Sequence, residues 1–411
     1  MLEDVVRRQW WPAVAALCRV TGDLSAAEDA VQEACAAAVQ QWAADGIPAN
    51  PVGWLVRVAR NKAVDTRRRD ALRSTKEQAS MDESLDDYDR ATTDARDDML
   101  SLIFLCCHPA LDPSVRIALT LRAVCGLSVK EVAAGFLVPE ATMAKRLVRA
   151  RQKIRDSRIP LRTPVGPELD ERLPSVLRVI YVTFTEGHAA TTGFDVVRGD
   201  LCDVSIAVAR DLAALMPDNP EVLGLLALLL LTDARRPARA DPAGDLVLLE
   251  DQDRRLWNRA LLDEGRALVE RALPMPQLGP YQIHAAIAAC HADAQSMDAT
   301  DWRQIALLYD ELIRLEPSPV IEANRAVAVA MSESPAAGLV ILDAVGQHPQ
   351  LQRWPQLHIA RGELLRRCGR PDEAALAFRA ALELEPGGAT RTFILRRLSA
   401  LGPEGATPPH G

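Results

Sequence analysis

The sequence predicts an all-α protein. Aromatic residues make up only 4% of the 411 residues, and long β-branched runs are few. Apolar residues recur every three to four positions along almost the whole chain, which is the period of an amphipathic helix. The hydrophobic fraction of 48% and the charged fraction of 25% are ordinary for globular proteins and argue against wholesale disorder. At roughly 100–200 residues per domain, the length predicts two to four domains.

The first predicted domain covers residues 1–75. Asp23 is expected to start a helix over Ala26–Trp42, and a short loop over Asp45–Pro51 separates it from a second helix over Trp54–Arg69. The next segment, 76–98, is predicted to be a flexible acidic linker. Within it, Glu77–Asp98 holds nine acidic and two basic residues and no convincing apolar stripe.

Residues 99–160 form a second predicted helical domain with the pattern of a helix-turn-helix. Its expected helices are Ser114–Cys125, Val129–Phe136 with Ser128 as its cap, and a last helix that Pro139 and Glu140 open and that runs to about Arg155. The apolar face of this last helix is Met143, Leu147, Ala150 and Ile154. The opposite face carries Thr142, Lys145, Val148, Arg149 and Gln152, flanked by Arg146, Arg151, Lys153 and Arg155. Such a basic helix suits a DNA major groove; the alternative is an ordinary solvated basic face.

Pro160, Pro164 and Pro167 mark a boundary, after which residues 168–411 are predicted to be a helical array. Ile305–Pro317 is similar to Ala374–Pro386, 69 residues later, with an intermediate copy at Ala336–Ala344. Half of that separation is close to the 34-residue period of tetratricopeptide helix pairs, so a solenoid is favoured over a chance likeness of Ala- and Leu-rich helices. The apolar run Val222–Leu231 has about half the length of a bilayer span and is expected to be a buried helix.

The net charge of −8 conceals an uneven distribution. Residues 1–160 have a net charge of +1 and residues 161–411 a net charge of −9. Two basic segments, Arg57–Lys76 and Lys145–Arg158, stand on either side of the acidic linker. The first adds a second basic surface, made of Arg57, Arg60, Asn61, Arg67 and Arg68. The helix before it carries Asp29, Gln32 and Glu33 at i, i+3 and i+4, which predicts one acidic and polar patch suited to a basic protein surface.

These motifs resemble the extracytoplasmic-function sigma factors, group four of the sigma-70 family. Ala27–Glu33 and Pro51–Arg68 are similar to region two of that family, and Val138–Arg151 is similar to region four. The remainder resembles the subgroup with a C-terminal tetratricopeptide-like helical extension. Leu105–Pro109, Phe184–Gly187 and Leu248–Asp253 add to this likeness.

The resemblance implies a subunit that directs core RNA polymerase to specific promoters and initiates transcription. Its implied partners are the β′ clamp helices and β flap of the polymerase, and promoter DNA. The implied polymerase-binding residues are Asp29, Gln32 and Glu33. The implied −10 residues are Asn50, Trp54, Arg57, Arg60, Asn61, Arg67 and Arg68. The implied −35 residues are Thr142, Lys145, Arg146, Val148, Arg149 and Arg151.

The acidic array beside two basic surfaces suggests control within the chain, by intramolecular contact with the sigma domains. It could cover the DNA-binding surfaces, or it could be a required scaffold. Two other functions remain open, an autonomous helix-turn-helix regulator with a sensing array and an adaptor scaffold. The Asp29, Gln32 and Glu33 patch favours the sigma factor, because a regulator that binds DNA alone has no use for it.

The cysteine and histidine motifs of the sequence are interpreted as structural and not as catalytic or metal-binding sites. No catalytic residue, cofactor or metal is expected. Cys106, Cys107 and His108 are adjacent on a helix and point about 100° apart, so core packing is favoured over a metal site. His284 and His291 are two turns apart, too far for one zinc ion without further ligands. Glu186 and His188 have no nucleophile motif beside them, although the Gly187–Gly193 loop could line a small ligand cavity. The eight scattered cysteines and the lack of an export signal predict a reduced, cytoplasmic protein.

Overall fold

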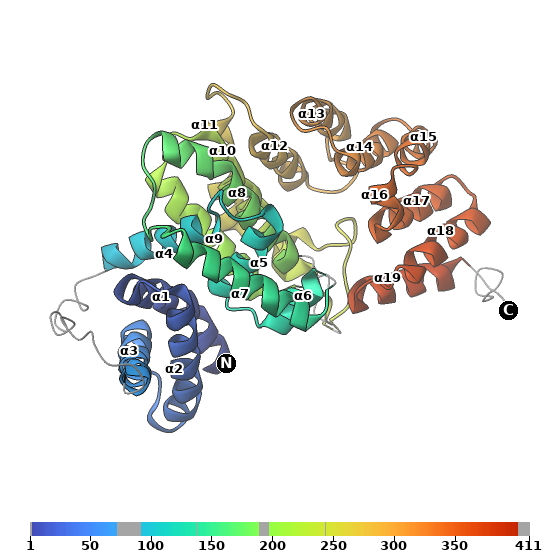
Figure 1. Cartoon of the computed structure of the whole chain (residues 1–411). Helices are drawn as coiled ribbons and strands as arrows, with labels where there is room; N and C mark the ends of the chain where they lie inside the picture. Colours follow the sequence, from blue (N-terminus) through green and yellow to red (C-terminus); the bar gives the residue numbers. More distant parts are fainter. Residues whose placement is uncertain (1, 72–91, 137, 189–196, 243, 402–411) are drawn as a thin grey trace. The chain divides into compact units, whose positions relative to one another are not determined.

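The computed structural model describes residues 2–71, 92–136, 138–188, 197–242 and 244–401. The regular elements in these ranges are helices, apart from an isolated bridge between Ala240 and Leu246, so the all-α prediction is confirmed. The chain divides into two compact units (Figure 1). Unit 1 comprises residues 1–184 and 203–212, and unit 2 comprises residues 185–202 and 213–411.

Unit 1 contains the N-terminal helices and most of the two that follow residue 160. Its helices are α1 (Leu2–Thr21), α2 (Leu24–Asp45), α3 (Pro51–Ala71), α4 (Thr92–Cys106), α5 (Pro113–Ala123), α6 (Val129–Gly135), α7 (Glu140–Asp156), most of α8 (Pro167–His188) and the middle of α9 (Gly199–Leu215). The first three helices pack on one another, and α4 packs on α1.

Short polar side chains start two of these helices, α2 and α6. The Oδ1 atom of Asp23 accepts hydrogen bonds from the backbone N–H groups of Ser25 at 2.8 Å and Ala26 at 3.2 Å. At α6 the backbone N–H of Ser128 donates to the Glu131 carboxylate, and the Glu131 N–H donates to the Ser128 hydroxyl. This reciprocal pair satisfies two donors that a helix start otherwise leaves open. The starts predicted at Asp23 and Ser128 are therefore confirmed.

The end of the predicted linker is helical. Most of the segment 76–98 lies outside the described residues, but α4 already begins at Thr92. The acidic composition was misleading because Asp98 is buried and forms an ion pair with Arg19 at 3.0 Å. An acidic residue that neutralises a base on α1 belongs to a packed helix rather than to a solvated linker.

The domain boundary predicted near residue 168 also differs from the structure. The first part of α8, up to Phe184, belongs to unit 1. Arg116 of α5 donates to the Ser175 hydroxyl of α8 at 2.6 Å and to the Leu111 carbonyl at 2.8 Å. The prolines near 160–167 therefore mark a turn within unit 1 rather than the start of unit 2.

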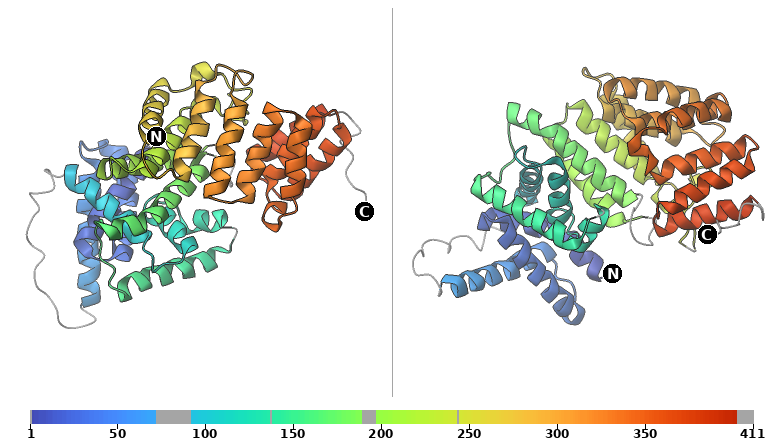
Figure 2. Two further views of the ribbon diagram at one scale, coloured as in Figure 1. Left: turned by 90° about the horizontal axis from the view of Figure 1, so that it is seen from above. Right: turned by 45° about the vertical axis from the view of Figure 1, so that its right-hand side comes forward.

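Unit 2 continues as a succession of helices, which Figures 1 and 2 show lying side by side from α10 to α19. They are α10 (Pro220–Asp233), η2 (Arg236–Ala238), η3 (Arg254–Leu256), α11 (Arg259–Ala272), α12 (Pro280–Asp293), α13 (Trp302–Leu315), α14 (Pro319–Ser332), α15 (Pro335–Val345), α16 (Pro349–Gln352), α17 (Pro355–Arg367), α18 (Pro371–Glu383) and α19 (Gly388–Ala400). The apolar run 222–231 lies within α10 and is buried throughout, as predicted.

The three similar sequence segments occupy equivalent places in this succession. They lie on α13, α15 and α18, and each of these helices packs on the helix before it, α12, α14 and α17 respectively. Small residues permit the close approach. A Cβ atom at Gly338 of α15 would lie 2.4 Å from that of Ala330 on α14, and one at Gly362 of α17 would meet the ring of Phe378 on α18. The repeat in the sequence thus corresponds to successive helical hairpins.

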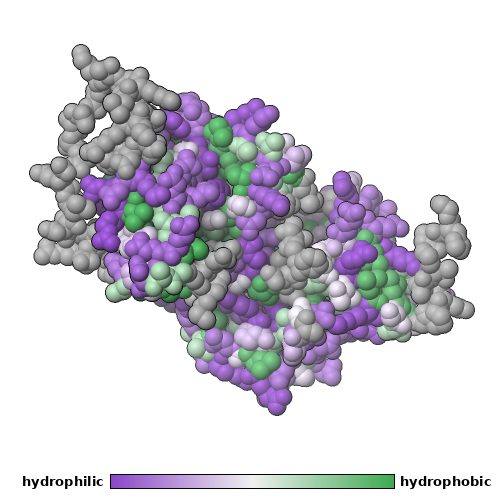
Figure 3. Space-filling model, turned by 90° about the horizontal axis from the view of Figure 1, so that it is seen from below, coloured by the Kyte–Doolittle hydropathy of each residue, from purple (hydrophilic) through white to green (hydrophobic). Residues whose placement is uncertain are grey.

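Among the described helices, none combines the length and the apolar composition that a bilayer span requires. The face shown in Figure 3 is mainly hydrophilic, with apolar residues in small separate patches. In unit 2 the apolar side chains form cores between successive helices. One such core joins α14, α15, α17, α18 and α19.

Three histidines of unit 2 are expected to make the protein less stable in mild acid. Burial lowers the pKa of His188 to about 2 and of His284 to about 4. Burial, with Arg235 and Arg254 nearby, lowers the pKa of His291 to about 4. Because the folded pKa is below the unfolded value near 6.5, only the unfolded chain gains protons as the pH falls from 6.5 towards 4. At pH 5.5 each histidine should lower the free energy of unfolding by about 1 kcal/mol relative to pH 7.5.

Urea unfolding at pH 7.5 and 5.5 measures this difference in the free energy of unfolding. Ordinary carboxylates stay ionised between these two pH values and contribute little to it. The control variant His284→Gln should reduce the pH dependence by about one third. Equal unfolding midpoints at the two pH values would show that these histidines are not kept neutral by burial.

Candidate nucleic-acid interface

The helix α7 has two chemically distinct faces. Its apolar residues Met143, Leu147, Ala150 and Ile154 are all buried, with at most 8% exposure. Thr142, Lys145, Arg146, Val148 and Arg149 are exposed, and Val148 has 61% of its surface accessible. Both faces agree with those predicted from the sequence. The exposed face presents three cations and two short side chains, the combination that suits phosphate contact with limited reading of base edges.

Packing against α5 and α6 fixes the orientation of α7. The three helices begin and end within three residues of the positions predicted for a helix-turn-helix. Gly126, at the end of α5, has a φ of +69° in the left-handed region, and a Cβ atom there would lie 3.0 Å from the Trp10 ring. A glycine is therefore required at this position both by the backbone and by the indole packed against it.

The acidic and polar patch predicted on α2 is exposed. Asp29, Gln32 and Glu33 share one face of the helix, while Ala30, Val31 and Ala34 are buried on the other. Glu33 forms an ion pair with Lys62 of α3 at 3.3 Å.

The residues predicted to contact the −10 element follow the loop between α2 and α3. Arg57 and Asn61 are exposed, and Arg60 is half-buried. Trp54 packs edge to face on Trp42, with ring centroids 5.3 Å apart, and Asn50 accepts a hydrogen bond from the Gly53 N–H at 2.9 Å. These last two side chains therefore shape the loop and the helix start. Arg67 and Arg68 lie on α3, but their side chains lie outside the described residues.

Comparison with known families identifies both regions. The family described as Sigma-70 region 2 matches residues 8–73, and the family described as Sigma-70, region 4 matches residues 101–154. The chain is a sigma factor. It therefore acts in transcription initiation, with RNA polymerase and promoter DNA as its partners.

The similarity also covers the C-terminal part of this sigma factor. Residues 172–273 match a family of unknown function, DUF6596. An uncharacterized protein of Rhizobium meliloti (strain 1021), R00370, is 43% identical over 401 residues, which are 96% of this chain and 94% of that protein. The sigma factor belongs to the same family as that protein along almost its whole length.

An ion pair joins regions two and four of the sigma factor. Glu28 of α2 is fully buried, and its carboxylate lies 2.5 Å from the Arg151 guanidinium of α7 and 4.0 Å from the Arg122 guanidinium of α5. Burial raises the pKa of Glu28, while the two arginines oppose that shift. Arg151, predicted to contact DNA, is thus half-buried in an internal contact.

Further contacts connect the same regions. Arg122 donates a hydrogen bond to the Gln32 amide oxygen at 3.1 Å and lies over the Trp10 ring. The Trp10 indole donates to the Ala123 carbonyl at 3.1 Å. Gln32, predicted to bind the polymerase, is therefore also engaged within the chain. Glu28 and Arg122 were not among the predicted site residues, because a carboxylate beside Asp29 has the sequence pattern of one exposed acidic patch.

The residues of the Cys106, Cys107 and His108 motif are buried or make local hydrogen bonds. Cys106 and Cys107 are fully buried, so the prediction of core packing is confirmed, and burial raises the pKa of Cys107 to about 12. His108 accepts a hydrogen bond from the Ala110 N–H. Within the described part of the chain, no group of three or more His, Cys, Asp or Glu side chains is arranged to hold a metal ion.

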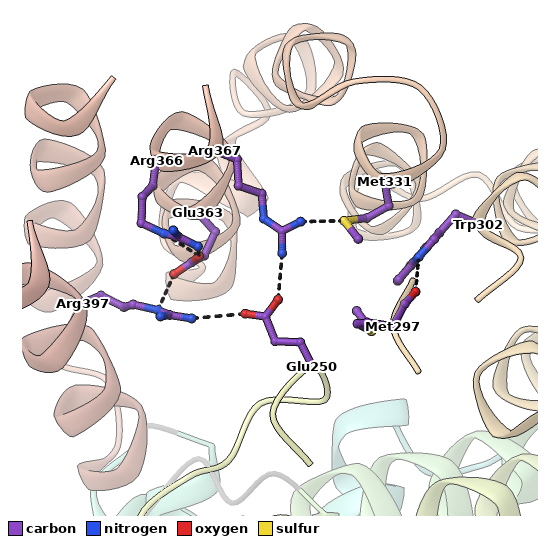
Figure 4. A network of polar contacts seen from close by, with 8 residues as sticks. All are labelled: Glu250, Met297, Trp302, Met331, Glu363, Arg366, Arg367 and Arg397. Atoms are coloured by element: carbon purple, nitrogen blue, oxygen red, sulfur yellow. Dashed lines mark hydrogen bonds and ion pairs between the residues drawn. The ribbon is translucent and has the colours of Figure 1, made fainter. Parts of the chain in front are cut away.

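A segment that we call the strap, residues 245–253, runs along the helices of unit 2 (Figure 4). Its Glu250 carboxylate binds Arg367 of α17 at 2.8 Å and Arg397 of α19 at 3.3 Å. Arg397 also binds Glu363 at 2.7 Å. A cavity of about 380 Å³ lies between the strap and α13, α14 and α17, and most of its lining is apolar, including Met297, Trp302, Met331 and Trp354. The strap contains the whole Leu248–Asp253 motif noted in the sequence.

Proposed function

We propose that this sigma factor is of the extracytoplasmic-function type and directs core polymerase to promoters with a −10 and a −35 element. The observation that carries this proposal is the arrangement of α7, whose apolar side is buried while its basic side is exposed. In this proposal Lys145, Val148 and Arg149 meet the −35 base edges, with Thr142 beside them. Arg146 neutralises phosphate, whereas Arg151, predicted for the same role, is held by Glu28 and fixes the position of α7 instead.

Region two would contact the polymerase and the −10 element. Asp29, Gln32 and Glu33 would dock on the β′ clamp helices, and region four would approach the β flap. Arg57, Arg60, Asn61, Arg67 and Arg68 would hold the −10 strand, with Asn50 and Trp54 in the loop before them. Selecting an extruded base from an opened duplex requires binding energy but no nucleotide hydrolysis, so the chain needs no catalytic residue of its own for this step.

The C-terminal array would be tetratricopeptide-like and would tune this activity. Support comes from the three hairpins formed by α12–α15, α17 and α18, and from the net charge of −9 in residues 161–411. The proposed location is the cytoplasm, where the polymerase and its promoters are.

Run-off transcription with purified core polymerase, with and without the sigma factor, tests the proposal. Templates would include the DNA upstream of its own gene. Specific transcripts that need the protein support it. Binding of duplex DNA without polymerase, and no specific initiation with it, would instead indicate an autonomous regulator.

Truncation after Leu215 tests the role of the array. This cut leaves α8 and α9 whole, whereas a cut at residue 168 would remove helices that belong to unit 1. In the same run-off assay, higher activity would identify a lid and lost activity a required scaffold. Unchanged activity, with unit 1 still folded by circular dichroism, would exclude a tuning role.

A further inference from the structure

Three arginines gather where α10 ends in unit 2. Arg235 and Arg239 stand on either side of η2, about one helical turn apart, and Arg254 begins η3. Each of the three is half-buried. Arg235 is close enough to both Arg239 and Arg254 for their charges to repel. We call these three residues the arginine cluster.

The cluster lacks the counter-ions that neighbouring arginines have. Arg236 binds Asp233 at 2.7 Å, and Arg255 binds Asp253 at 2.8 Å. Among the described residues, no carboxylate lies within ion-pair distance of Arg235, Arg239 or Arg254. Arg254 donates to two backbone carbonyls, those of His291 and Ala294, each at 2.7 Å. Carbonyl groups orient this guanidinium but do not neutralise it.

Buried hydrogen-bond donors also remain unused at the cluster. Within the described part of the chain, the Nε atom of Arg239, the Nη2 atom of Arg254 and the indole Nε1 of Trp257 are buried and have no acceptor. Arg254 lies over the Trp257 ring, 4.5 Å from its centroid. A buried donor without an acceptor costs on the order of 1–3 kcal/mol, and more when it carries charge. Three such donors in one place therefore call for an acceptor.

The arginines stay charged despite these surroundings. Burial, followed by repulsion from Arg239 and Arg254, lowers the pKa of Arg235 to about 10, and burial lowers that of Arg239 to about 10. Both are still protonated at neutral pH. His291 is kept neutral there, since burial and the nearby arginines lower its pKa to about 4. The local charge is thus close to three positive, without a matching negative charge from the described residues.

We propose that the arginine cluster is a binding site for a small oxyanion, the phosphate or carboxylate group of a ligand of this sigma factor. Guanidinium groups match both anions because their N–H donors form a planar fork. The ligand would also bind beside the strap, because Arg254 is only four residues from Glu250. Glu250 in turn forms ion pairs with α17 and α19. Occupancy of the cluster would thereby fix one end of the strap.

Thermal unfolding of the full-length sigma factor tests this proposal. Inorganic phosphate and succinate are added separately at constant ionic strength, with chloride as the reference salt. A bound anion should raise the Tm by a few degrees at roughly ten times its dissociation constant. A response to phosphate alone, or to succinate alone, identifies the group that the site accepts. No response to either anion overturns the proposal.

Arg235→Met and Arg239→Met make the test specific. In chloride each variant should have a Tm equal to or above that of the wild type, because an unneutralised buried charge is removed, and each should lose the anion response. The matched control is Arg255→Met, beside Arg254, where the arginine is 88% exposed and already paired; it should keep the full response. A lower Tm of Arg235→Met in chloride would mean that the cluster is structural, and a retained anion response would mean that the anion binds elsewhere; either result overturns the proposal.

Discussion

Replacing Arg151 by methionine is expected to lower the free energy of unfolding of the sigma factor by about 3 kcal/mol. The change leaves Glu28 fully buried, with only Arg122 at 4.0 Å to compensate its charge. Removing one member of a buried ion pair typically costs about 3–5 kcal/mol. Urea unfolding followed by far-UV circular dichroism measures the change, since the protein is almost entirely helical.

Two further variants make this expectation specific. Arg155→Met is the matched control on the same helix, because Arg155 is 57% exposed and lies 3.8 Å from Asp23; about 0–1 kcal/mol is expected there. The double variant Glu28→Leu/Arg151→Met should recover most of the lost stability, since an apolar pair can replace a buried ion pair. If Arg151→Met unfolds like the wild type, the contact between regions two and four contributes nothing to stability.

Replacing Lys145 or Arg149 by alanine is expected to reduce promoter-dependent transcription at least fivefold, with little change in stability. Both side chains are exposed on the face of α7 opposite its buried residues. Each base contact is worth about 1–3 kcal/mol, or roughly 5- to 150-fold in binding. Run-off transcription measures the effect, and thermal unfolding confirms that the variants are folded.

Arg158→Ala is the control for this second experiment. Arg158 is also exposed and basic, but it follows the last residue of α7 and lies outside the predicted DNA-binding set. Its removal should change transcription less than threefold at constant salt. Equal losses for Arg158→Ala, Lys145→Ala and Arg149→Ala would indicate nonspecific attraction to DNA rather than a −35 contact.

Local sequence patterns predicted much of the fold. The helix-turn-helix follows from the period of Met143, Leu147, Ala150 and Ile154 and from the signals at Ser128 and Pro139, all of which act within a few residues. The hairpins of unit 2 follow from a repeat that is visible in the sequence. Such features depend on neighbours along the chain, so a single sequence contains them.

Features that depend on distant residues were not predicted. Glu28 stands beside Asp29 and looks like part of the same patch, yet its partner is 123 positions away at Arg151. Asp98 was assigned to a linker because its partner Arg19 is on another helix. The arginine cluster needs Arg254 to meet Arg235, although 18 residues of chain separate them. The Arg235–Arg239 spacing after a buried helix was the one local signal of that cluster.

The strap changes the order in which the helices of unit 2 are expected to unfold. Solenoids of helical hairpins commonly fray from an end, one repeat at a time, because each repeat contacts only its neighbours. Here the terminal helix α19 is fastened to a much earlier segment, through Arg397 to Glu250 and through Arg396 to Asp245. Opening α19 must therefore release the strap as well, so amide hydrogen exchange in α17, α18 and α19 should be coupled in one cooperative step rather than graded towards the C-terminus.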